Sequence, residues 1–193
     1  MQFSRYLLAL AVSAGALTAC GSDSTDASAT PTPGSAQLPP TTNGADVETW
    51  LAAGSYKKWK CETASHPQMK VSPHGENRIC SNDLIANFTG EKDEERPKDS
   101  AAVKELYNDA KELVGYAVAV KLADTSDGGK NWYWYERVPL DSAAPHDAKG
   151  VVADGVGTTG PAKQICVGCH VAAGLDDDHT VTGSSDFVYD VVN

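Results

Sequence analysis

The feature that most constrains this chain is a pair of cysteines near its C-terminus, followed directly by a histidine. The run is Cys166-Val167-Gly168-Cys169-His170. On a helix this spacing puts the two thiols about one turn apart, on the same side. They can then add to the two vinyl groups on one edge of a porphyrin, with the next imidazole directed at the iron. We therefore expect one covalently attached haem c, bound through Cys166 and Cys169, with His170 as the proximal iron ligand.

Two other uses of paired cysteines fit the sequence less well. A thioredoxin-like redox pair needs no histidine directly after the second cysteine, and it belongs in a βαβ context that this sequence lacks. A zinc site would need further ligands at metal spacing, and no second close cysteine pair supplies them.

The first residues indicate export. Arg5 precedes an apolar stretch, Leu7–Leu17, that is too short to span a bilayer. The stretch ends in Leu17-Thr18-Ala19-Cys20, which resembles the lipobox of bacterial lipoproteins. We expect a signal peptide over residues 1–19 and a diacylglycerol anchor on Cys20. The alternative is an ordinary cleaved signal peptide in which Cys20 has no role.

A tether and one folded domain are expected after the anchor. Residues 20–44 are rich in Ser, Thr, Ala, Asp and Pro, so they cannot bury enough apolar surface to order themselves. We expect the haem domain to occupy residues 45–193. Because Gly21 follows Cys20, the chain lacks the aspartate that often retains lipoproteins in the inner membrane. We therefore expect a protein anchored in the outer membrane of the bacterial cell envelope, facing the periplasm.

Charge and cysteine usage fit an exported protein. The net charge of −10 argues against nucleic acid as a partner. Of the five cysteines, Cys61 and Cys80 remain once lipid and haem are assigned. Outside the cytoplasm such a pair tends to oxidise, so we expect a Cys61–Cys80 disulfide. The alternative is two buried free thiols.

Periodicity and turn residues predict several elements. A helix starts near Asp46–Leu51 and stops at Gly54, and a short second element follows at Tyr56–Trp59. Alternation predicts strands over Leu113–Leu122 and Asn131–Val138, joined by a hairpin turn at Asp127-Gly128-Gly129. Weaker patterns favour a strand over residues 77–82, a loop over 141–160, a helix over 161–173 and a last strand over 186–192.

The position of the haem motif argues against an ordinary electron carrier. Only 23 residues follow His170 and none is methionine, while Met69 is the only methionine after the signal peptide. The chain therefore cannot take a methionine ligand from downstream of the motif. The predicted strands before the motif also argue against a four-helix cytochrome c′.

These features together resemble the cytochrome P-460 family, which includes the β-type cytochromes c′. The similarity runs from about Trp50 to Val191 and depends on the order of several short pieces. They are His74-Gly75 to Arg78, Asn82, Pro97, Val103-Lys104-Glu105-Leu106, Gly115-Tyr116, Asp127-Gly128-Gly129, Trp132-Tyr133-Trp134-Tyr135-Glu136 and the haem motif.

The resemblance implies an α+β fold: a mostly antiparallel β-sheet with flanking helices and a C-terminal haem-attachment helix, often as a homodimer. It also implies a haem whose distal side is open or apolar. Some family members oxidise hydroxylamine or nitric oxide, and in those a lysine is covalently linked to the porphyrin. Lys104 best matches that lysine, and a solvated surface lysine is the alternative. Asp99-Ser100 stands near where a glycine is common in the family.

Three uses of such a haem stay open on the sequence. The first is oxidation of a small nitrogen compound by a haem-dependent oxidoreductase. The second is binding of nitric oxide or another diatomic molecule without turnover, and the third is electron transfer to a redox protein partner. We expect His74 to make a hydrogen bond inside its own loop; the alternative is an approach to the haem, for which His74 is the first candidate among the other histidines. We expect Glu136 to be a solvated strand end, and the aromatic run Trp132–Tyr135 to pack in the core and in part line the haem cavity.

Overall fold

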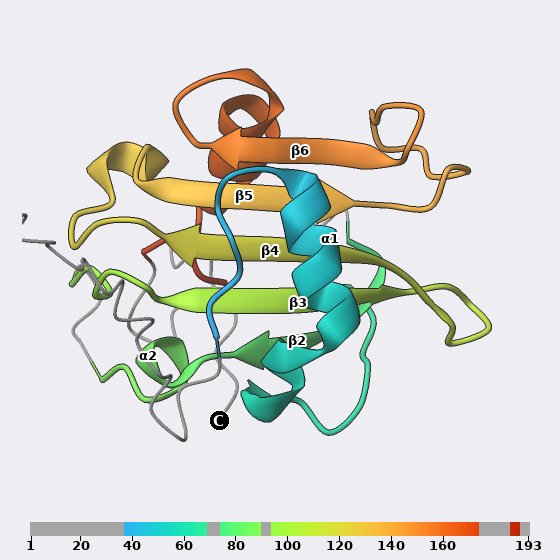
Figure 1. Cartoon of the computed structure of the whole chain (residues 1–193), viewed down its shortest axis with the longest axis horizontal. Helices are drawn as coiled ribbons and strands as arrows, with labels where there is room; N and C mark the ends of the chain where they lie inside the picture. The colour runs from blue at the N-terminus through green and yellow to red at the C-terminus, as the bar shows by residue number, and fades with distance from the viewer. Residues whose placement is uncertain (1–36, 69–73, 90–93, 174–185, 190–193) are drawn as a thin grey trace, which may run out of the picture. The chain divides into compact units, whose positions relative to one another are not determined.

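A six-stranded antiparallel sheet forms the centre of the domain (Figure 1). The computed structural model describes residues 37–68, 74–89, 94–173 and 186–189, all within one unit, Pro33–Asn193. The strands lie in chain order: β1 (Lys60–Cys61), β2 (Glu76–Ser81), β3 (Ala101–Tyr107), β4 (Leu113–Lys121), β5 (Trp132–Arg137) and β6 (Val151–Val156). The expectation of a mostly antiparallel α+β fold is confirmed.

One face of the sheet is covered by helix α1 (Gly44–Ala53), which crosses it in Figure 1. The Asn43 side chain caps the start of α1 by accepting a hydrogen bond from the Asp46 amide (3.0 Å). Gly54 ends it in the left-handed conformation (φ 69°), which costs glycine no steric strain. Short helices follow at η1 (Ser55–Lys58) and α2 (Asp83–Ala86). The predicted helix start, stop and second element are confirmed.

Side chains along the strands alternate between the two faces of the sheet, and a hydrophobic core lies on each face. On the α1 side, β3 contributes Ala101 and Val103 to a cluster with Val47, Trp50, Leu51 and Tyr56. On the other side, Ala102 lies in register with Ala119, and Ala119 with Trp134. The next row on that side pairs Lys104 with Ala117, and Ala117 with Glu136. The second face therefore presents small side chains in its middle, with larger ones around them.

The haem motif lies in a short helical segment beside β5 and β6 (Figure 1). A π-helix, η3 (Ala162–Val167), runs directly into α3 (Gly168–His170). Helical structure expected over residues 161–173 is present over residues 162–170, and its first six residues are π-helical, which makes them wider than α-helical turns. Such π turns are rare and often lie at functional sites.

Two expectations for the second half of the chain are wrong, and one is confirmed with a different turn. Residues 141–160 were expected to be a loop, but β6 lies within them, because pairing with β5 orders this edge strand despite the glycines in and beside it. The expected hairpin is present, since β4 and β5 pair antiparallel, but its turn at 127–129 is a 3₁₀ turn, η2 (Asp127–Gly129), within a longer connection. Residues 186–189 form a turn and an irregular segment instead of a strand, and the rest of that predicted strand lies outside the described residues.

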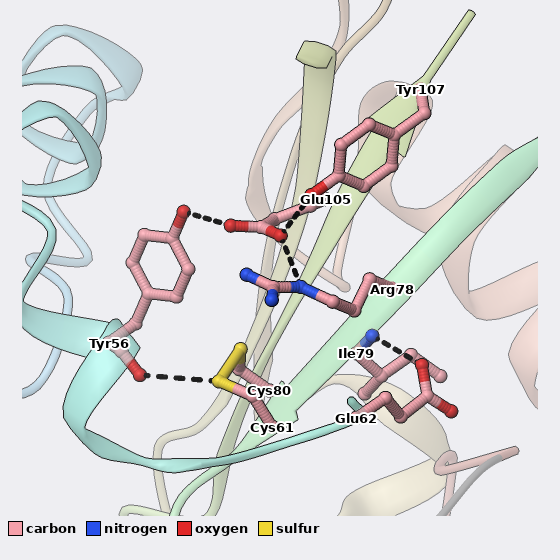
Figure 2. The surroundings of a disulfide bond; sticks show 8 residues. All are labelled: Tyr56, Cys61, Glu62, Arg78, Ile79, Cys80, Glu105 and Tyr107. Atoms are coloured by element: carbon pink, nitrogen blue, oxygen red, sulfur yellow. Dashed lines mark hydrogen bonds and ion pairs between the residues drawn. A yellow bond between two sulfur atoms is a disulfide. The ribbon is translucent and has the colours of Figure 1, made fainter. Parts of the chain in front are cut away.

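The α1 face holds a disulfide and a buried polar cluster (Figure 2). Cys61 of β1 and Cys80 of β2 lie opposite each other and form a disulfide. Beside it, the carboxylate of Glu105 accepts hydrogen bonds from Tyr56 Oη (2.6 Å), Arg78 Nε (2.7 Å) and Tyr107 Oη (2.6 Å). The cluster links η1, β2 and β3.

The last residues assigned to the tether also contact the domain. The carbonyl of Gln37 accepts a hydrogen bond from Trp50 Nε1 (3.0 Å), and Leu38 packs against the α1 core. Gly44 donates its amide to Asp154 (2.7 Å). The signal peptide, Cys20 and the tether up to residue 36 lie outside the described residues. Within the part of the chain that is described, no helix has the length and apolar character to cross a membrane.

Candidate haem site

A cavity of about 750 Å³, which includes space open to solvent, lies on the sheet face opposite α1. Strands β2 to β5 supply one wall, and the haem-motif segment and residues 187–189 supply the other. The side chains that line it are mostly apolar: Ile79, Ile85, Ala102, Ala117, Ala119, Trp134, Ile165, Phe187, Val188 and Tyr189.

The centre of the sheet wall is made of alanines. Ala102, Ala117 and Ala119 come from β3 and β4 and lie in adjacent rows of the register. Trp134 closes one side of these rows from β5. Because methyl groups fill little space, the alanines leave room for a flat group to stand against the sheet.

All three residues of the predicted haem attachment line this cavity. Cys166 is buried, with 7% of its surface exposed, and Cys169 is partly exposed. Both are free thiols in the structure. Burial raises the pKa of the Cys166 thiol to about 12. The structure thus brings Cys166, Cys169 and His170 to one apolar space.

The imidazole of His170 is held in a defined orientation. Its Nδ1 lies 2.7 Å from the carbonyl oxygen of Phe187, which assigns the ring proton to Nδ1. Its ring packs against Trp134 (centroids 4.6 Å apart) and Tyr189 (5.1 Å). Burial lowers the pKa of His170 to about 3, so the ring is neutral, the form that binds metals. Nε2 is therefore the nitrogen of His170 that can coordinate iron.

The segment that orients His170 is itself anchored to the sheet. The buried carboxylate of Asp186 accepts hydrogen bonds from Lys121 Nζ (2.7 Å), the Arg96 amide (2.7 Å) and the Ser126 hydroxyl. Tyr189, three residues after Asp186, donates a hydrogen bond from its Oη to the carbonyl oxygen of Cys169 (2.7 Å). Residues 186–189 thus link β4 to the haem motif.

Lys104 lies on the cavity side of β3, half-buried, between Ile79 of β2 and Ala117 of β4. It is separated from Cys166 by more than 60 residues of sequence, yet both line the same cavity. A side chain at this position can contact a group bound in the cavity.

Glu136 and His74 form a pair that the sequence analysis did not predict. Glu136 is not solvated as expected: it is 3% exposed, because it lies on the cavity side of β5. His74 Nδ1 lies 3.1 Å from Glu136 Oε1, and both side chains line the cavity. The alternation of β5 could have shown this, since Glu136 is two residues from Trp134 and shares its face.

The other histidines lie elsewhere. His66 Nε2 contacts Glu62 (3.2 Å) and His146 Nδ1 contacts the carbonyl of Asp147 (2.7 Å). Neither lines the cavity. His179 lies outside the described residues. Of the aromatic run, Trp134 and Tyr135 reach the cavity, and Trp132 and Tyr133 pack in the two cores.

The residues around the cavity fit a haem. The donor set is two thiols and one neutral imidazole, the set that haem c uses. Trp134 provides an independent observation in favour of a bound group, because its buried Nε1–H has no acceptor among the described residues. Buried donors are rarely left unsatisfied, so an acceptor supplied by a bound group, such as a propionate, would complete the site.

Comparisons with known protein families, with curated proteins and with solved structures found no match. The function proposed below therefore depends on the residues of the site.

Proposed function

We propose that this chain is an exported c-type haem protein that binds, and oxidises, small nitrogen compounds such as hydroxylamine or nitric oxide. The single observation that carries the proposal is the meeting of Cys166, Cys169, His170 and Lys104 in one apolar cavity. A motif match alone would not bring its three residues to one apolar cavity, beside the lysine that the family resemblance singles out.

Each residue has a role in this proposal. Cys166 and Cys169 hold the haem by thioether bonds, and His170 coordinates the iron through Nε2 while the Phe187 carbonyl fixes its tautomer. When bound, the haem supplies an iron that can take a small ligand and exchange electrons with it. The apolar walls limit the access of water, and Lys104 contacts the porphyrin from β3.

The test is a spectrum combined with a peptide map of the protein matured in a host that attaches haem c. We expect the haem on the peptide that contains Cys166 and Cys169, and a bond between the porphyrin and Lys104. The ferrous Soret band should then be strongly red-shifted, and Lys104→Arg should return it to an ordinary position. The Cys61→Ser/Cys80→Ser variant is the matched control, because it removes two cysteines that do not line the cavity and should keep the haem.

Two results would contradict parts of the proposal. A peptide map without haem on Cys166 and Cys169 removes the function as a whole. An unmodified Lys104 peptide with an ordinary ferrous high-spin spectrum removes the oxidation and leaves a protein that binds nitric oxide or another diatomic molecule.

Electron transfer is the second candidate function, and one observation favours it. The ring of His74 lies close to that of His170, with the centroids 6.3 Å apart. A haem with a histidine on both sides would suit electron exchange with a redox protein partner. Titration of the ferrous protein with nitric oxide separates the candidates, because an electron carrier should keep both histidines on the iron, whereas a protein that takes small ligands should exchange one of them for nitric oxide.

The cellular setting is proposed from the sequence alone. A lipid on Cys20 would hold the domain at the outer membrane, facing the periplasm, on a tether that leaves the cavity accessible to small molecules. A homodimer is expected from the resemblance.

A further inference from the structure

We infer that His74 is a second protein ligand of the haem iron, on the side opposite His170, and that Glu136 holds it there. The inference rests on the proposed haem at His170. It goes beyond it by assigning the other axial position to a residue from a distant part of the chain.

The first evidence is that His74 and His170 share the surroundings of metal-binding histidines. A histidine that binds a metal through one ring nitrogen nearly always makes a hydrogen bond with the other, to a carboxylate or a backbone carbonyl. His170 Nδ1 bonds to the Phe187 carbonyl (2.7 Å), and His74 Nδ1 to the Glu136 carboxylate (3.1 Å). Coordination by His74 would therefore use Nε2, as for His170.

The second evidence is the distance between the two rings. Nitrogen–metal bonds of imidazole are about 2 Å long, so two imidazoles on opposite sides of one metal have ring centres about 6 Å apart. The centroids of His74 and His170 are 6.3 Å apart. A distal histidine that left room for a ligand on the iron would have to lie farther from His170.

The third evidence is that the pair is built into the domain. The side chains of His74 and Glu136 are only 10% and 4% exposed. Glu136 lies on β5, in a row with Ala117 and Lys104, while His74 belongs to the segment that precedes β2. A buried carboxylate is costly unless it is paired, and a metal-bound imidazole is a suitable partner.

The position of His74 also changes how a small ligand reaches the iron. A molecule that binds the iron must displace His74. Its apparent affinity is therefore the intrinsic affinity multiplied by the small fraction of protein in which His74 is off the iron. Replacing His74 should therefore raise the affinity for carbon monoxide by about tenfold or more.

The experiment compares the spin state of the ferric, haem-loaded protein with that of three variants, by electron paramagnetic resonance and optical spectroscopy. We expect the wild type to be low-spin, and His74→Ala to be high-spin and to return to low-spin on addition of imidazole. Glu136→Gln should stay low-spin with a higher reduction potential, because the lost carboxylate no longer makes the imidazole a stronger donor to ferric iron. His66→Ala is the matched control, since His66 also contacts a carboxylate but lies away from the cavity.

Each other outcome overturns the inference. A wild type that carries haem but is high-spin in the ferric state shows that His74 does not bind the iron, and leaves the proposed function standing. A His74→Ala protein that stays low-spin without imidazole shows that another group, such as Lys104, is the ligand. A wild type that matures without attached haem removes the proposed function itself. If His74→Ala does not fold, His74→Gln, which keeps a hydrogen-bonding side chain, should give the same high-spin spectrum.

Discussion

At the scale of single residues, Glu105 shows how this domain stabilises a charge in its interior. It is 1% exposed and accepts hydrogen bonds from one guanidinium and two phenols (Figure 2). Burial acts to raise its pKa, but the hydrogen bonds from Arg78, Tyr107 and Tyr56 outweigh burial and hold the pKa below its ordinary value. Glu105 is therefore ionised in the folded protein at neutral pH.

We expect Glu105→Gln to lower the free energy of unfolding at pH 7 by about 2–3 kcal/mol, because it leaves Arg78 without a charged partner. The contribution of Glu105 is present above the unfolded pKa, near about 4.3, and is lost as the pH falls through the lower pKa of the folded state. Urea unfolding followed by circular dichroism at several pH values measures both effects, and the difference between wild type and variant should shrink in acid.

Glu76→Gln is the control for this prediction. Glu76 also accepts a hydrogen bond from a basic residue, Lys111, but the pair lies at the surface. Its loss should change stability far less than the loss of Glu105. Equal effects of the two substitutions would contradict the role given to burial.

At the scale of elements, the segment of residues 186–189 connects the sheet to His170. Asp186 fixes the start of the segment through Lys121 of β4 and the Arg96 amide. Phe187, the next residue, provides the carbonyl that orients His170. Because the Lys121–Asp186 pair is almost fully buried, with the side chains 0% and 3% exposed, loss of either charge leaves the other unpaired in the interior.

We expect Asp186→Asn to destabilise the domain by about 3 kcal/mol, as for other buried ion pairs that lose one partner. The matched control is Asp127→Asn, which breaks a pair with Lys130 in which both side chains are more than half exposed. This control should change the free energy of unfolding by no more than about 0.5 kcal/mol. Urea unfolding of both variants decides the question, and a change in Asp186→Asn as small as the control's would refute the anchoring role.

At the scale of the whole molecule, one covalent link ties the first strands together. Cys61 and Cys80 are 19 residues apart and join β1 to β2. Closing a loop of this length stabilises a domain by about 3 kcal/mol on the chain-entropy model. We expect the Cys61→Ala/Cys80→Ala variant to lose about this much in urea unfolding. Alkylation of the unreduced wild type should label neither cysteine, and labelling of both would disprove the bond.

The sequence predicted the local features of this molecule well, and those that depend on distant contacts poorly. Capping residues and Gly54 define α1, and the alternation of apolar residues defines β4 and β5, so these elements could be predicted. Strand β6 could not, because its glycines suggest a loop and its strand conformation comes from pairing with β5. Strand β3 carries two adjacent charged residues, Lys104 and Glu105, so its sequence does not look buried although Glu105 is 1% exposed.

The same distinction applies to the site. Cys166, Cys169 and His170 are neighbours in sequence, so their chemistry is visible in a short motif. The pairing of Glu136 with His74 depends on 62 residues of intervening chain, and neither residue shows it alone. Only the fold brings the two onto the cavity wall.

The burial of Cys166 has a consequence for how the protein is made. In the folded domain this thiol belongs to the π-helix η3 and is 7% exposed, and burial raises its pKa to about 12. A thiol so enclosed is closed off from an attachment enzyme. If haem is attached to Cys166 as proposed, attachment would therefore have to precede the closure of the sheet over this thiol. A domain that folded earlier would then be stable yet empty.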